Sequence, residues 1–219
     1  MKITLRRTAG LVSALALSVA LTGCGSDSDN SADDGADDGA MPDKTTSMEA
    51  EAQTFGDACS AVPTSGPGSF DGMVQDSVAT AASNNPLLST LVAAVGSIDG
   101  MADTLNGSEA LTVFAPTDDA FAEIPKTDLD AMVADAQKMG EDSDLYKVLA
   151  HHVLGENADP AAVAGEKETL AGDSLTVKGD AESGMTVTDG TVTANVLCGN
   201  IPTANATVYV IDKVLTGVK

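Results

Sequence analysis

Two adjacent histidines, His151 and His152, are the only histidines of the chain and its first candidates for acid–base or metal chemistry. They fall in a predicted helix over 142–153, where neighbouring side chains point roughly 100° apart. Such a pair does not readily share one metal ion, whereas histidines four residues apart do. Helical phasing from Leu145 predicts that His152 points into the core and that His151 lies at the edge of the apolar face or in solvent. The sequence therefore predicts a core histidine with satisfied ring nitrogens at position 152.

Catalytic motifs with a recognisable spacing are missing from the sequence. It contains no G-x-S-x-G elbow, no phosphate-binding glycine loop, no C-x-x-C pair and no H-E-x-x-H motif. The acids around Asp27 and Asp29 lack the glycine and the terminal glutamate of an EF-hand calcium loop. A carboxylate pair for glycoside hydrolysis stays open, because 33 acidic residues offer many combinations. These observations predict a protein that is not an enzyme and uses neither a metal nor a cofactor.

The formal net charge of −22 limits the classes of partner. Nucleic-acid binding depends on Lys and Arg side chains that neutralise phosphates, so this chain is not expected to bind nucleic acid. Its acidity is better suited to solubility and to spacing from a charged surface than to recognition of a cationic ligand.

The cysteine at position 24 follows a short apolar run. Basic residues, among them Arg6 and Arg7, precede this run over 9–21, which is too short for a permanent membrane helix and is typical of a secretory signal. Leu-Thr-Gly-Cys24 resembles the bacterial lipobox, which implies a signal peptide over 1–23 and a diacylated Cys24 as the mature N-terminus. The general secretory route and the twin-arginine route both stay open.

A change of composition marks a single folded domain. Residues 24–54 are rich in Asp, Ser, Gly and Ala and poor in large apolar residues, which predicts a disordered acidic linker. Large apolar residues return at Phe55, so we expect one domain over 55–219. Cys59 and Cys198 lie near its two ends. Export permits a disulfide between them, and two separate buried thiols are the alternative.

The domain begins with helical patterns and ends with strand patterns. Asn85 and Pro86 predict a helix start, and Thr117 is expected to cap a short helix behind a strand over 111–116. Further helices are expected over 127–139 and 142–153. Short β-branched runs over 175–178, 185–188, 191–198 and 207–215 then predict strands joined by hairpins. Helices first and strands later are typical of an α+β domain.

Three segments together resemble the signatures of fasciclin-like domains. The first runs from Thr112 through Phe114, Pro116 and Thr117 to Phe121, the second is Leu-Ala-His-His-Val-Leu over 149–154, and the third extends from Asn205 through Asp212 to Leu215. With the outlying cysteines, the domain is also similar to the secreted immunogenic fasciclin proteins of actinobacteria and their lipidated relatives.

The resemblance implies a compact β-wedge with a layer of helices and a disulfide between Cys59 and Cys198. It also implies that His152 takes the histidine position of the family and that Thr117 and Asp212 order the two signature strands. His151 stands where the family usually has tyrosine, which weakens any transfer of the integrin recognition attributed to this segment in animal relatives.

These features predict a monomeric binding or adhesion module. We expect a lipid anchor to hold it at the extracytoplasmic face of the cell membrane, with part of it shed or secreted, where it contacts an extracellular protein, glycan or lipid. The alternative function is carriage of a small apolar or lipid ligand at the cell envelope, because an aliphatic wedge could open a groove.

Overall fold

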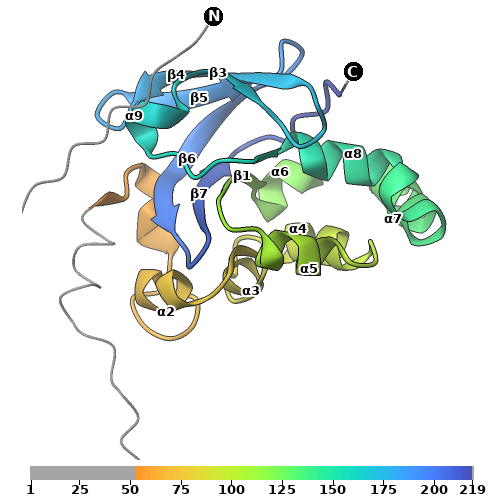
Figure 1. The fold of residues 1–219 in the computed structure, drawn as a ribbon, viewed down its shortest axis with the longest axis horizontal. Helices are drawn as coiled ribbons and strands as arrows, with labels where there is room; N and C mark the ends of the chain where they lie inside the picture. Colours follow the sequence, from red (N-terminus) through yellow and green to blue (C-terminus); the bar gives the residue numbers. More distant parts are fainter. Residues whose placement is uncertain (1–52, 219) are drawn as a thin grey trace, which may run out of the picture. The chain divides into compact units, whose positions relative to one another are not determined.

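The computed structural model describes residues 53–218, in which the helices lie on one side of a folded sheet except for a short helix over 160–163, which lies beside the outer strands (Figure 1). The helical elements are η1 (Asp57–Ala61), α2 (Phe70–Gln75), α3 (Val78–Ser83), α4 (Ser89–Gly96), α5 (Met101–Gly107), α6 (Asp118–Ala122), α7 (Lys126–Met139), η2 (Gly140–Asp142), α8 (Asp144–His151) and α9 (Pro160–Val163). The strands are β1 (Leu111–Pro116), β2 (Val153–Leu154), β3 (Gly165–Glu168), β4 (Ser174–Asp180), β5 (Gly184–Thr188), β6 (Thr193–Pro202) and β7 (Ala206–Ile211). This arrangement confirms the predicted α+β class. The predicted signal peptide, Cys24 and nearly all of the predicted linker lie outside the described residues.

The strands of this region form one sheet in the order β2-β1-β7-β6-β5-β4-β3. β1 pairs in parallel with β7, and the other neighbours are antiparallel. The first residues of β6 pair with β5, and the strand pairs with β7 from Val196 onwards, with register shifts on both sides of Cys198. Such bulges bend a strand and increase its twist. β6 therefore leads from one half of the sheet into the other, and the two halves fold towards each other as a wedge.

Two apolar clusters fill the spaces on either side of β1 and β7. In β1, Val113 packs towards the helices, whereas Phe114 packs into the wedge between the two halves of the sheet. In β7, Val208 and Tyr209 divide in the same way. Both strands are buried along their whole length. Because successive side chains point to opposite faces, a strand between two cores is apolar at most positions, and the buried hydroxyls of Thr112 and Thr207 are hydrogen-bonded.

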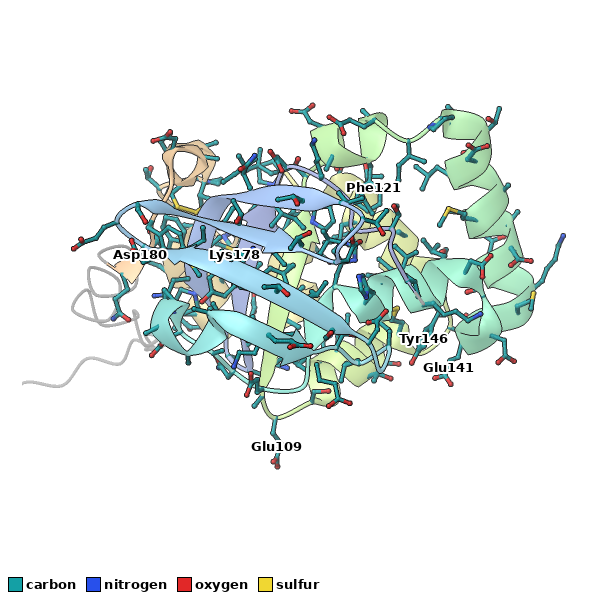
Figure 2. The ribbon with its side chains drawn as sticks, turned by 90° about the horizontal axis from the view of Figure 1, so that it is seen from above. Glu109, Phe121, Glu141, Tyr146, Lys178 and Asp180 are labelled. Carbon is teal, nitrogen blue, oxygen red and sulfur yellow. A yellow bond between two sulfur atoms is a disulfide. The ribbon has the colours of Figure 1, made fainter. Side chains whose placement is uncertain are left out.

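The outer half of the sheet has one solvent face. In β4, Leu175 and Val177 are buried in the wedge, whereas Lys178 and Asp180 are exposed. Figure 2 shows both exposed side chains on this half of the sheet, and Glu109 pointing away from the domain just before β1. This half-buried alternation explains why the sequence predicts β4 and β5 well.

The helix predicted to start at Asn85 and Pro86 begins later, at Ser89. The Asn85 Oδ1 accepts a hydrogen bond of 3.0 Å from Leu87 N and so forms a turn ahead of the helix. The first turn of α4 is capped from a distance, because Asp118 Oδ1 accepts a bond of 2.6 Å from Thr90 N. The prediction of this helix start was therefore wrong, since the cap comes from a residue at the start of α6.

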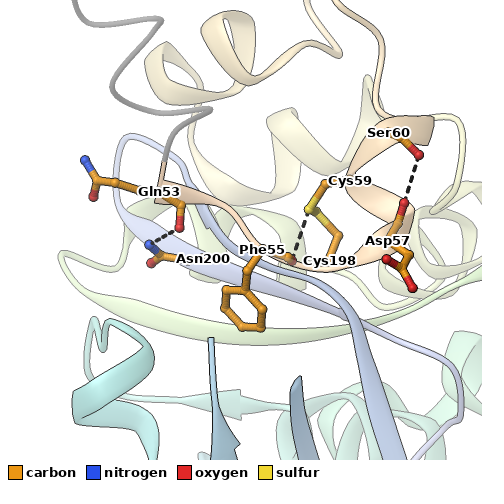
Figure 3. Close-up of a disulfide and its surroundings, with 7 residues drawn as sticks. All are labelled: Gln53, Phe55, Asp57, Cys59, Ser60, Cys198 and Asn200. Atoms are coloured by element: carbon orange, nitrogen blue, oxygen red, sulfur yellow. Dashed lines mark hydrogen bonds between the residues drawn. A yellow bond between two sulfur atoms is a disulfide. The ribbon is translucent and has the colours of Figure 1, made fainter. Parts of the chain in front are cut away.

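The chain enters the domain along β6 and is covalently joined to it. Phe55 and Gly199 form an antiparallel bridge with backbone hydrogen bonds of 3.2 and 2.8 Å. A Cβ at Gly199 would lie 2.3 Å from the Phe55 ring, so any other residue there would force this ring to move. Cys59 of η1 forms a disulfide with Cys198 of β6 (Figure 3). Of the two alternatives that the sequence leaves open, the structure has the disulfide.

Candidate functional site

His152 lies where a helix, a central strand and the C-terminal segment meet. Its Nδ1 donates a hydrogen bond of 2.7 Å to the Val148 carbonyl oxygen of α8, and its Nε2 accepts one of 3.0 Å from Leu215 N. Its own carbonyl oxygen accepts from Phe114 N of β1 at 2.9 Å. The side chain is buried, as its helical phase predicts. Both ring nitrogens are occupied by backbone partners, so His152 acts as a cross-link and offers no nitrogen for proton transfer.

Burial gives His152 a pH-dependent effect on stability. Removal from water lowers its pKa from 6.5 to about 4, against the raising effect of the hydrogen bond to Val148. The unfolded chain therefore binds a proton between pH 6.5 and 4 that the folded chain does not bind. We expect the free energy of unfolding to fall by about 3 kcal/mol between pH 7 and pH 4, measured by urea unfolding at each pH.

The His152→Gln variant is the control for this pH dependence. It should be less stable than the parent at pH 7 but should lose most of the slope between pH 7 and pH 4, because it lacks the titrating ring. Asp118 and Asp189 also have lowered pKa values, but they change the free energy of unfolding mainly below their ordinary pKa of 3.8. They therefore contribute little to the slope between pH 7 and pH 4. An equal slope in parent and variant would show that His152 is not the responsible group.

His151 is buried, contrary to the prediction that it lies at the edge of the apolar face or in solvent. Its Nδ1 lies 2.6 Å from Asp173 Oδ1, and its Nε2 lies 3.7 Å from Asp189 Oδ2. Asp173 directly precedes β4, and Asp189 directly follows β5. The connections of the outer half of the sheet thus cover this side of α8 and supply two acidic partners. The helical pattern around His151 contains no sign of these distant residues.

Asp189 connects the histidine pair with the C-terminal segment. Its Oδ1 accepts from the backbone N–H groups of Thr191 and Val192, and its Oδ2 accepts from Gly217 N, each at 2.7 Å. Burial raises the pKa of Asp189, but these three donors and the nearby His151 outweigh it and hold the pKa below its ordinary value. A Cβ at position 217 would lie 2.6 Å from the Asp189 Cγ, so glycine is needed there.

The residues of the first signature tie β1 to its surroundings. Thr112 Oγ1 donates to the Glu156 carbonyl oxygen at 2.7 Å and accepts from Ala158 N at 3.0 Å. The Phe114 ring packs against Tyr209 of β7 with their centroids 5.6 Å apart. The Thr112 bonds therefore hold the segment after β2 against β1, and the ring contact holds β1 against β7.

The signature residues at the carboxyl ends of β1 and β7 make hydrogen bonds and apolar contacts that hold these strand ends in place. Pro116 is the last residue of β1, and the next hydroxyl, Thr117 Oγ1, accepts a bond of 3.2 Å from the third residue of α6. Phe121 of the same helix is buried. Asp212, just after β7, accepts bonds of 2.7 and 2.6 Å from the backbone and side-chain amides of Asn195.

Asn205 joins the opposite ends of β1 and β7 to the helices. Its Oδ1 accepts from Val78 N at 2.9 Å, and its Nδ2 donates to the Leu105 and Ser108 carbonyl oxygens at 2.8 Å each. The signature residues therefore form cross-links at different ends of the two parallel strands and do not converge on one site.

An apolar cavity of about 360 Å³ lies beside His152, between three helices and the central strand. Its walls come from α3, α4 and α5, and its floor comes from Val113, Phe114, Leu149, His152 and Val153. Folded domains contain few voids larger than a water molecule, and ligand pockets typically measure about 300 to 1,000 Å³. The sequence contains no signal for this cavity, because its lining comes from short helices without strong periodicity.

Within residues 53–218, no group of three or more His, Cys, Asp or Glu side chains is arranged to hold a metal ion. Across the same residues, no helix is both long enough and apolar enough to cross a bilayer.

Comparison with known proteins gives consistent matches. A family model described as Fasciclin domain matches residues 86–217. Cell surface glycolipoprotein MPB83 of Mycobacterium bovis is 40% identical over 221 residues, which cover 95% of each chain. Immunogenic protein MPB70 of the same species is 44% identical over 154 residues, which cover 68% of this chain and 74% of MPB70. A solved FAS1 domain pair from the insect cell adhesion molecule fasciclin I matches 60% of this chain and 45% of its own, with 22% identity and a TM-score of 0.47.

Proposed function

Because this chain belongs to the fasciclin domain family, we propose that it is a binding or adhesion module held at the extracytoplasmic face of the cell membrane by a lipid anchor at Cys24. The observation that carries this proposal is the similarity to a cell surface glycolipoprotein over 95% of both chains. That match extends beyond residues 53–218. The lipobox-like Leu-Thr-Gly-Cys24 supplies the chemistry for an anchor, since two acyl chains bind a membrane far more firmly than one.

The arrangement of the histidines supports binding rather than catalysis. His152 has both ring nitrogens bonded to backbone groups, and His151 is buried between Asp173 and Asp189. A general base must reach the proton that it removes, so neither ring is placed for that role. The domain instead provides a disulfide-bonded scaffold that presents its surface to a partner.

The exposed surface favours a polar partner. Among residues 53–218, Met139 and Leu170 are the only large apolar side chains that are exposed, each to 50%. The surface residues labelled in Figure 2 include the charged Glu141, Lys178 and Asp180. An extracellular protein or glycan bound here would make polar contacts, since a broad apolar patch is the usual mark of a hydrophobic interface.

Carriage of a small apolar ligand is a second candidate function, and the cavity of about 360 Å³ favours it. The two functions use different parts of the domain, because a surface partner contacts exposed polar residues whereas a carried ligand occupies the space between α3, α4 and α5.

The binding function can be tested with the full chain, its disulfide intact, on arrays of extracellular matrix proteins, glycans and lipids. We expect saturable binding to one class of target that persists at physiological salt, because a specific face combines shape with charge. The same chain with its disulfide reduced serves as the control, and it should bind less if the folded surface is responsible.

Two outcomes would contradict the proposal. Binding that disappears on raising the salt from low to physiological concentration would indicate nonspecific attraction of an acidic protein. Failure to bind any target on the arrays would remove the support for an adhesion module.

A further inference from the structure

Small residues leave the cavity beside His152 unfilled. Ala79 and Ala82 of α3 and Ala102 of α5 line it, and all three are half-buried. A larger aliphatic side chain at any of these positions would extend into the space between the helices. Unfilled apolar volume destabilises a fold in proportion to its size, so a ligand that restores the missing contacts would bind favourably.

The lining of the cavity carries no charge. Its residues are aliphatic, aromatic or neutral polar, and His152 has no free ring nitrogen because Val148 and Leu215 occupy both. Burial also lowers the pKa of His152 to about 4, which keeps the ring neutral at pH 7. The cavity therefore provides no cation to pair with a carboxylate or phosphate, and an unpaired charge in such a site is costly.

Apart from the buried His152, the polar residues of the lining are Thr80, Ser83, Asn84 and Asn106, and we place the mouth of the cavity at their exposed side. Thr80, Ser83 and Asn84 line it and are exposed, and Asn106 is half-buried. One acid is joined to this mouth, because Asp76 Oδ2 accepts a bond of 3.2 Å from Asn84 Nδ2. Hydroxyl and amide groups suit an uncharged polar head group, and both Asp76 and the net negative charge of the chain disfavour an anionic one.

The volume sets the size of the ligand. An apolar cavity of about 150 Å³ holds one benzene molecule, so a cavity of about 360 Å³ has room for roughly twelve to fourteen carbon atoms. A smaller void of about 20 Å³ borders the same Val78, Ala82, Leu91 and Val113 side chains, so movement of these side chains could lengthen the space.

We propose that this cavity binds one alkyl chain of about twelve carbon atoms from a neutral amphiphile, with its uncharged head group at Thr80, Ser83 and Asn84. The inference rests on the second candidate function and names its ligand class. The chain can come from a free fatty alcohol or from a neutral glycerolipid, since both share this chemistry.

The test uses the full chain with Cys24→Ser, so that neither an acyl group of the protein nor detergent competes for the cavity. Monolauroylglycerol, dodecanol and dodecanoate share one alkyl chain length and differ in head group. Native mass spectrometry gives the stoichiometry, and thermal unfolding followed by circular dichroism gives the shift in midpoint. We expect one bound molecule and a midpoint increase of roughly 5 to 10 °C for a neutral probe at a hundred times its Kd.

The probes distinguish the source and the charge of the ligand. Stronger binding of monolauroylglycerol than of dodecanol would indicate a glycerolipid, and the reverse order would indicate a free alcohol. Dodecanoate at pH 7 should bind at least tenfold more weakly than the better neutral probe, because the mouth offers it no cation. Equal or stronger binding of dodecanoate would overturn the assignment of an uncharged head group.

Filling the cavity locates the binding. In Ala102→Leu and Ala82→Leu, which fill it from α5 and from α3, neutral-probe binding should weaken at least tenfold while the ligand-free unfolding midpoint stays at or above that of the parent. Ala93→Leu is the matched control on the exposed side of α4 and should bind like the parent. Unchanged binding in both filled variants, or no binding of any probe, would overturn the inference, whereas binding to the protein and glycan targets of the arrays tests the surface module separately.

Discussion

Loss of the disulfide between Cys59 and Cys198 is expected to lower the free energy of unfolding by about 5 kcal/mol. The bond spans 139 positions of the sequence, so it removes much of the conformational freedom of the unfolded chain. It also holds η1 and the Phe55 bridge against β6. Urea unfolding of the Cys59→Ser, Cys198→Ser double variant measures this loss.

The reduced parent chain is the matched control for this prediction, because it loses the bond without a change of sequence. Both the reduced parent and the double variant should unfold at clearly lower urea concentration than the oxidised parent. Equal midpoints for the oxidised and reduced parent would mean that the bond contributes little and that the entry segment is held by its backbone contacts alone.

Asn205→Ala is expected to lower the free energy of unfolding by about 2 to 4 kcal/mol. The substitution removes three hydrogen bonds, to Val78 N and to the Leu105 and Ser108 carbonyl oxygens. These bonds connect the start of β7 with α3 and α5, and the variant leaves each of the three backbone groups without its side-chain partner. Urea unfolding with an unchanged slope measures the difference in stability.

Two comparison variants separate the role of the Asn205 bonds from loss of the side chain. Asn205→Asp keeps the shape and an acceptor for Val78 N but places a carboxylate against two carbonyl oxygens, so it should also destabilise. Asn84→Ala removes an exposed amide with one bond, to Asp76, and should cost less than about 1 kcal/mol. Equal losses for Asn205→Ala and Asn84→Ala would contradict the cross-link.

The elements with a local signal could be predicted from the sequence. The alternation in β1 and the β-branched runs of β4, β5, β6 and β7 predict strands that the structure contains, with ends shifted by a few residues. Thr117 caps α6 as its position predicts. The helical phase around Leu145 correctly predicts the inward orientation of His152.

Features that depend on distant partners could not be predicted. His151 is buried because Asp173 and Asp189 reach it from two strand connections, and α4 starts at Ser89 because Asp118 caps it. β3 has no apolar residue in its Gly-Glu-Lys-Glu segment, so only its pairing with β4 makes it a strand. The predicted helix over 142–153 ends at His151, since Val153 pairs with β1 instead.

The cavity of the candidate site could not be predicted from the sequence either. Ala79, Ala82 and Ala102 are ordinary helix residues in the sequence, and only the packing of α3 against α5 and of both against β1 turns them into the lining of a hollow. Shape created by small side chains on separate elements has no signature along the chain. The cavity, and the ligand that we propose for it, could therefore be inferred only from the folded domain.

The most direct test of a lipid-anchored module on the cell surface is surface labelling of intact cells that express the protein, followed by mass spectrometry of the captured chain. The exposed lysines Lys126, Lys138 and Lys178 provide sites for a membrane-impermeant biotin reagent. We expect capture without lysis and an N-terminal peptide that begins at Cys24 and carries the mass of a diacylglyceryl group. Capture only after lysis, or a chain in which Cys24 is internal or unmodified, would contradict a lipid-anchored module on the cell surface.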